Sequence, residues 1–222
     1  LRAESIKYDY NNRMNSGNVR EDGTNCGFGG CYYNRPDDRS DSYNELSARI
    51  GLTTDFDNVN YFLQASLGFR PPQINEAYRL QKKQKVSDLD SEKLTMIEIG
   101  TTFNLENLDG SISVYKSKKR NSIFRDSENF IIDNGKTNHK GIELTVNIGI
   151  GERSNLAANL TYGDHKYDFN SDTSMREKIR IGNHIDTSPK LMANAILNTS
   201  ITENLSLAFE LERMDSYFTD AA

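Results

Sequence analysis

Residues Asn60 to Leu80 read NYFLQASLGFRPPQINEAYRL and contain the pattern that decides the fold. From Tyr61 to Phe69 every second residue is apolar, and most of the residues between them are polar or glycine. Side chains on a β-strand alternate between the two faces of a sheet, so this segment predicts a strand with one apolar face. Pro71 and Pro72 follow and cannot continue a hydrogen-bonded ladder. The chain is therefore expected to leave the sheet there.

The same alternation recurs along the chain and predicts about nine strands. The expected strands are 1–10, 43–56, 61–69, 94–105, 111–124, 141–150, 155–169, one around 191–197 and one around 205–211. Short turns alternate strictly with longer polar loops at 11–42, 70–91, 125–138 and 170–188, and all four prolines lie in these loops or directly after them. A barrel that crosses a membrane has short turns on one side and long loops on the other. The pattern predicts an all-β fold: part of an antiparallel transmembrane β-barrel.

Composition limits the other classes of protein. The 222 residues could hold one all-β domain or two small domains. The mean hydropathy of −0.71 and the lack of a long apolar run exclude membrane helices, but a membrane barrel carries its apolar residues at every second position. A net charge of −5 and a pI of about 5.3 argue against a nucleic-acid partner.

Aromatic residues gather near the ends of the expected strands. Membrane barrels carry such residues as girdles at the two interfaces, although ordinary edge aromatics would give the same pattern. The residues are Phe56, Tyr61 and Phe103 near the short turns, and Phe69, Tyr162 and Tyr217 near the long loops.

Two cysteines, Cys26 and Cys31, flank a glycine-rich spacer in the first long loop. A disulfide between them would fix this loop and would imply an oxidising compartment. Free thiols and a metal site are the alternatives. The metal reading is the weaker one, because no histidine lies nearby and two thiolates leave a zinc site incomplete.

Several short motifs together resemble the barrel of TonB-dependent outer-membrane receptors. GFRPPQ at 68–73 and NEAYRLQ at 75–81 resemble the entry of a loop in that family. Ser91-Glu92, ahead of the strand with IEIG at 97–100, and NGKTNHKGIE at 134–143 resemble strand entries. GNHI at 182–185 ahead of SPK at 188–190 resembles a stretch near the end of the barrel.

This resemblance implies a barrel of about 22 strands whose lumen is filled by an N-terminal plug. It implies a Gram-negative outer membrane and uptake of a scarce nutrient, such as a ferric siderophore, driven by the TonB complex through an N-terminal box. Residues 1–222 are then expected to form part of a single barrel domain, without the plug domain and without the C-terminal strand. Alone, such a part would leave open strand edges in lipid. Neither an enzymatic activity nor a cofactor is expected.

Four residues near the second long loop are the candidates for ligand contact. An anionic metal chelate favours arginine and an aromatic wall. The candidates are Arg70, Tyr78, Arg79 and Gln81. The alternative is that this stretch packs the loop against the barrel rim.

Other polar clusters give weaker signals. His139, His165 and His184 lie far apart in the sequence and form no catalytic motif. Asp88, Asp90 and Glu92 lack the spacing of a calcium loop. Basic residues at Lys82, Lys83 and Lys85 and along 116–120 could contact lipopolysaccharide phosphates, or could be ordinary solvated strand ends.

Two other classes of protein compete with the receptor hypothesis. One is a soluble or surface-attached β-sandwich that binds glycans, and the other is a passive porin or adhesin barrel. In a sandwich the apolar rows would meet a second layer of sheet, whereas in a membrane barrel they would face lipid.

Overall fold

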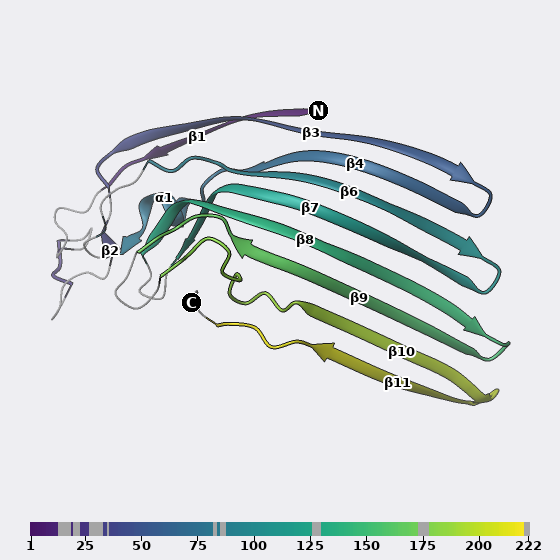
Figure 1. The fold of residues 1–222 in the computed structure, drawn as a ribbon. Coiled ribbons are helices and arrows are strands. Elements are labelled where there is room, and N and C mark those ends of the chain that lie inside the picture. Colours follow the sequence, from purple (N-terminus) through teal and green to yellow (C-terminus); the bar gives the residue numbers. More distant parts are fainter. Residues whose placement is uncertain are drawn as a thin grey trace.

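A computed structural model describes residues 1–12, 19, 23–26, 33–34, 36–81, 84, 88–125, 130–172 and 178–219. Nine strands within these residues form one antiparallel sheet in the order β1-β3-β4-β6-β7-β8-β9-β10-β11 (Figure 1). The strands are β1 (Arg2–Tyr10), β3 (Arg39–Phe56), β4 (Val59–Arg70), β6 (Glu92–Leu105), β7 (Leu108–Arg125), β8 (Ile131–Ile150), β9 (Ser154–Tyr167), β10 (Leu191–Thr202) and β11 (Leu205–Met214). The predicted all-β fold with about nine meandering strands is confirmed.

The two ends of the sheet differ, as the sequence predicts. Turns of two or three residues, at 57–58, 106–107, 151–153 and 203–204, join strands at one end. The longer connections gather at the other end (Figure 1). This end also carries the helix α1 (Ile74–Tyr78) and a small ladder between β2 (Tyr33–Asn34) and β5 (Leu80–Gln81).

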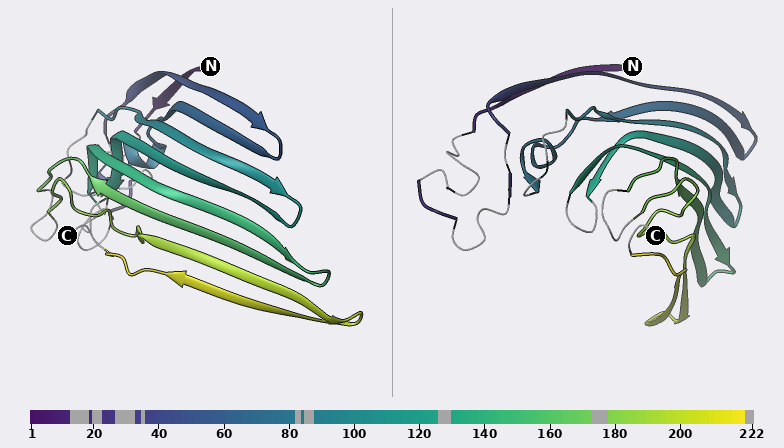
Figure 2. Two further views of the ribbon diagram at one scale, coloured as in Figure 1. Left: turned by 45° about the vertical axis from the view of Figure 1, so that its right-hand side comes forward. Right: turned by 60° about the vertical axis from the view of Figure 1, so that its left-hand side comes forward.

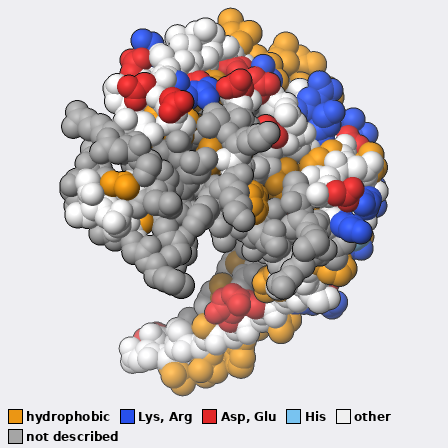
Figure 3. All heavy atoms as spheres, turned by 90° about the vertical axis from the view of Figure 1, so that its left-hand side faces the viewer, with side chains coloured by type: hydrophobic (Ala, Val, Ile, Leu, Met, Phe, Trp, Pro, Cys, Tyr) orange, Lys and Arg blue, Asp and Glu red, His pale blue; other side chains and the backbone are white. Residues whose placement is uncertain are grey.

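The sheet is a single curved layer with a convex and a concave face (Figure 2). The exposed apolar side chains of the strands lie on the outward, convex face. Hydrophobic side chains recur along the outer rim, with basic and a few acidic side chains between them (Figure 3). Ile50, Leu52, Phe56 and Leu211 are each 70% exposed or more. Among the described residues no second sheet covers this face, so the sandwich alternative is wrong and the sheet corresponds to part of a barrel wall.

The height of the apolar face suits a bilayer. On β8 the outward apolar residues run from Ile142 to Ile150. At a rise of about 3.4 Å per residue and a tilt of about 40°, this length spans roughly 20 Å along the barrel axis. The apolar band of an outer-membrane barrel is roughly 25 Å tall.

The inward, concave face of the sheet is polar and hydrogen-bonded. Across β3, β4 and β6, Arg49 donates to Gln64, which in turn donates to Glu98. Across β8 and β9, the Thr145 hydroxyl donates to Asn159 over 3.0 Å. Arg49 and Glu98, which are charged and lie in the middle of strands, thus have polar partners on the concave face.

Strand register keeps the two faces apart. One outward row across β6 to β9 consists of Ile99, Val114, Ile142 and Tyr162, which lie opposite one another in turn. A slip of one residue would exchange the faces of a whole strand, so this matching fixes the register.

Phe62 points inward as an exception to the alternation. It lies opposite Gly100, where an added Cβ would come within 2.5 Å of the Phe62 ring, so the ring occupies the space that the glycine leaves.

The predicted loop 125–138 is wrong. Strand β7 continues to Arg125 and β8 begins at Ile131, so residues 126–130 alone separate them. Likewise β3 begins at Arg39, inside the predicted loop 11–42. These extensions lie beyond the apolar band, where both faces of a strand tolerate polar side chains, so the alternation that predicts strands is lost.

Helices give no membrane span. Within the described residues, no helix is long and apolar enough to cross a bilayer.

The two faces predict effects of different size for the same kind of substitution. Leu144 lies on the outward face of β8, and its neighbour Thr145 is exposed on the inward face. We expect Leu144→Arg to lower the free energy of unfolding by about 2–4 kcal/mol, because it places a cation in hydrocarbon. Thr145→Arg should cost about 1 kcal/mol or less, mainly through the lost hydrogen bond to Asn159. Urea unfolding of the full-length protein in vesicles measures both; equal losses would contradict the assignment of faces.

Candidate functional site

A buried carboxylate joins the sheet to the second long connection. Glu92, the first residue of β6, has a side chain that is only 3% exposed. It accepts a hydrogen bond from Arg70 Nε at 2.5 Å and one from the backbone N–H of Ile123 at 2.9 Å. Lys119 Nζ lies 2.8 Å from Oε1, the same oxygen that accepts the Ile123 N–H, whereas Arg70 binds Oε2. The buried charge of Glu92 is thus neutralised by two cations from β4 and β7.

The same arginine holds the helix. Nη1 and Nη2 of Arg70 donate to the two oxygens of Glu76 at 3.0 and 3.1 Å. Glu76 also accepts the backbone N–H of Gln73 at 2.7 Å, which caps the start of α1. Arg70 therefore fixes α1 directly against the ends of β4 and β6.

Tyr78 anchors the other end of α1. It is 4% exposed, and its ring stacks on Tyr10 with centroids 4.5 Å apart. Its hydroxyl donates to Asp41 at 2.6 Å, and Asp41 is held in turn by Arg39. Burial, together with this hydrogen bond, raises the pKa of the Tyr78 hydroxyl above its usual value. Tyr78 is therefore a neutral donor at physiological pH.

Apolar residues beneath these contacts complete the rim. One buried cluster joins the connection 71–91 to β7 and β8, and a second joins the connection 168–190 to β7, β8 and β9. The first contains Ala77, Tyr78, Leu80, Leu89, Ile123 and Ile131, and the second contains Ile132, Tyr167 and Ile179. The extended ends of β7 and β8 thus support a packed rim around the concave face.

The four candidate ligand residues lie in different surroundings. Arg70 and Tyr78 are engaged with the rim by the contacts above. Arg79 has an exposed side chain, and its carbonyl accepts a hydrogen bond from Arg125 at 3.3 Å. The backbone of Gln81 pairs with Tyr33, and its side chain lies outside the described residues. Ligand contact stays a prediction for all four, and Arg79 is best placed to make it.

Some predicted features fall outside the described residues. These include Lys82, Lys83, Lys85 and Cys31. The Cys26–Cys31 disulfide therefore stays a prediction.

Two histidines that are distant in sequence meet on the concave face. His139 on β8 and His165 on β9 lie opposite each other, and their Nδ1 atoms are 2.9 Å apart. Sequence reasoning missed this pair, although both residues lie equally far from the turn at 151–153, which is the signal that could have found it.

The acidic residues at 88–92 do not form one cluster: Asp88 pairs with Arg39 at 2.9 Å, whereas Glu92 pairs with Arg70 and Lys119. The part of the chain that the structure describes holds no group of three or more residues suited to a metal ion.

The chain is similar to one protein family and to several solved structures. The family described as TonB dependent receptor-like, beta-barrel matches residues 1–220. No curated protein matches the chain.

Several solved structures share the fold at low sequence identity. The ferric-catecholate import receptor Fiu from E. coli K12 has a TM-score of 0.64 and 14% identity, and the match covers 96% of this chain and 31% of Fiu. The unliganded ferric citrate transporter FecA has a TM-score of 0.67 and 19% identity over 82% of this chain and 27% of FecA. The copper transporter OprC has a TM-score of 0.61 and 18% identity over 79% of this chain and 27% of OprC. The chain thus spans under a third of the length of these structures.

Removal of the buried charge tests the rim. In Glu92→Gln we expect the two cations and the Ile123 N–H to lose a charged acceptor, at a cost of about 2 kcal/mol to the local structure. Hydrogen exchange of the Glu76 and Ala77 amides, which donate to Gln73, should accelerate by roughly thirtyfold.

Glu98→Gln, on the same strand, is the matched control. Glu98 accepts a hydrogen bond from Gln64 and makes no contact with α1 among the described residues, so exchange in α1 should not change. Unchanged exchange in both variants would show that Glu92 does not hold α1.

Proposed function

The chain belongs to the TonB-dependent receptor β-barrel family, and from this premise we propose that the protein is an outer-membrane receptor that takes up a scarce nutrient, such as a ferric siderophore, by TonB-coupled transport. One observation carries the proposal: a single-layered wall, apolar outside and polar inside, bears a packed rim at the end of the long connections. The proposed role is transport rather than catalysis.

We further propose that residues 1–222 are part of one barrel domain. Because the chain spans under a third of its structural relatives, the rest of the barrel would come from the rest of the protein. A plug domain would face the polar rows that include Arg49, Gln64 and Glu98. The TonB complex would act through a box in the N-terminal region of the protein.

The proposed ligand is an anionic metal chelate. The relatives named above are a ferric-catecholate receptor, a ferric citrate transporter and a copper transporter, which supports a metal-containing substrate class. Arg79 follows α1 directly and is exposed at the rim. Arg70 and Tyr78 would hold α1, and through it Arg79, in place.

Charge reversal tests this role. A deletion strain carrying Arg79→Glu should need about ten times more ferric chelate for half-maximal growth, because one attractive charge becomes repulsive. Growth on a panel of ferric chelates as sole iron source measures the effect and also names the substrate.

Arg153→Glu is the matched control, since Arg153 is exposed in a short turn at the opposite end of the sheet. Equal growth of the two variants would remove Arg79 from the site. Uptake that persists after inactivation of TonB would instead indicate a passive porin or adhesin barrel.

A further inference from the structure

Cations gather on the outward face, immediately beyond the apolar rows. Next to the row of Ile99, Val114, Ile142 and Tyr162, the register places Ile97, Lys116, Lys140 and Asp164 opposite one another in turn. The following row consists of Thr95, Lys118, Asn138 and Lys166. Four lysines thus lie within two rows at the edge of the apolar band.

The protein supplies one carboxylate for two of these lysines and no ion pair among the described residues for the other two. Asp164 is shared, with Lys140 at 3.4 Å and Lys166 at 3.3 Å. Lys116 and Lys118 are exposed and make no ion pair with any described residue. Lys116 also lies directly opposite Lys140, and like charges in this arrangement destabilise a sheet. An external anion would relieve this repulsion.

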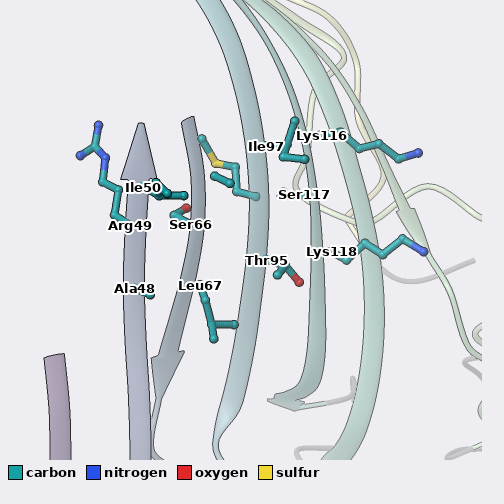
Figure 4. Close-up of a pocket in the computed structure, with 12 residues that line it drawn as sticks. Ala48, Arg49, Ile50, Ser66, Leu67, Thr95, Ile97, Lys116, Ser117 and Lys118 are labelled. Carbon is teal, nitrogen blue, oxygen red and sulfur yellow. The ribbon is translucent and has the colours of Figure 1, made fainter. Parts of the chain in front are cut away.

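An apolar groove adjoins the lysines (Figure 4). The two rows continue from β6 across β4 to β3, as Ile97, Ala65 and Ile50 in one and as Thr95, Leu67 and Ala48 in the other. The small residues Ala48, Ala65 and Thr95 leave a hollow between the larger side chains, and Lys116 and Lys118 form its edge. In Figure 4 both lysines lie on one side of the groove, with Ile97 and Thr95 between them and Leu67.

We propose that this lysine-edged groove, lined by the residues just named, binds a phosphorylated lipid of the outer leaflet. A phosphate lies among Lys116, Lys118 and Lys140, and an acyl chain occupies the hollow. Lysines are suited to phosphate as compact point charges, and basic residues beside a membrane attract anionic lipid. Free phosphate would leave the hollow empty, and an uncharged lipid would leave the lysines unpaired. The chemistry matches the lipid A part of lipopolysaccharide, in which phosphates adjoin acyl chains.

Native mass spectrometry of the full-length protein in detergent tests the site. Three probes are added separately: lipid A, dephosphorylated lipid A and inorganic phosphate. We expect the wild type to retain lipid A and to bind the dephosphorylated form at least tenfold more weakly, because each basic contact to anionic lipid contributes about 1 kcal/mol. The K116Q/K118Q variant should lose roughly tenfold or more in lipid A affinity for the same reason. Inorganic phosphate should not displace lipid A at equal concentration.

Two further variants separate the contributions. K7Q/R213Q removes two exposed cations that have acidic partners, Asp9 at 3.0 Å and Asp215 at 3.4 Å, and should retain lipid A like the wild type. Ala65→Leu fills the hollow and should weaken lipid A while leaving the lysines in place. Resistance to unfolding in SDS confirms that each variant is folded.

Equal retention of lipid A by the wild type and K116Q/K118Q would overturn the proposal. Displacement of lipid A by inorganic phosphate would also overturn it, since the site would then recognise phosphate alone. These outcomes are independent of nutrient uptake, because Arg79 and the concave face take no part in them.

Discussion

The fold depends on one constraint: the side chains of a single sheet layer must sort into two environments. No second layer covers the outward rows of the described sheet, so their apolar side chains require hydrocarbon, while the inward rows require polar partners. Both requirements act on every strand at once. The shared row of Ile99, Val114 and Ile142 shows how strictly neighbouring strands must agree in register.

At the end of the long connections, a buried charge stabilises the structure together with two buried apolar clusters. Glu92 contacts two cations and a backbone N–H donor. One of the cations, Arg70, also binds Glu76 and so holds α1 in place. Arg70 and Tyr78, which the sequence suggested for ligand contact, therefore stabilise the rim. The adjacent Arg79 is exposed beside this fixed support, where we propose that it contacts the ligand.

The two faces of the wall suggest separate interactions. The proposed anionic chelate would bind at the rim of the concave face, and the proposed anionic lipid would bind at the convex face. Both assignments rest on cations, but the cations differ in their surroundings: Arg79 borders a packed connection, whereas Lys116 and Lys118 border an apolar groove. Neighbouring chemistry, rather than charge alone, separates the two kinds of ligand.

The sequence by itself determined the strand alternation, the short turns and the family, because these are local patterns of period two and short motifs in order. It did not determine that strands continue through 131–138, since polar residues on both faces of a strand outside lipid carry no such pattern. The burial of Glu92, the meeting of His139 with His165 and the lysine rows were decided by the tertiary structure alone. Each of these three features brings together residues from different strands. Which residues meet is set by the register and the curvature of the sheet, and both arise only when all the strands pair.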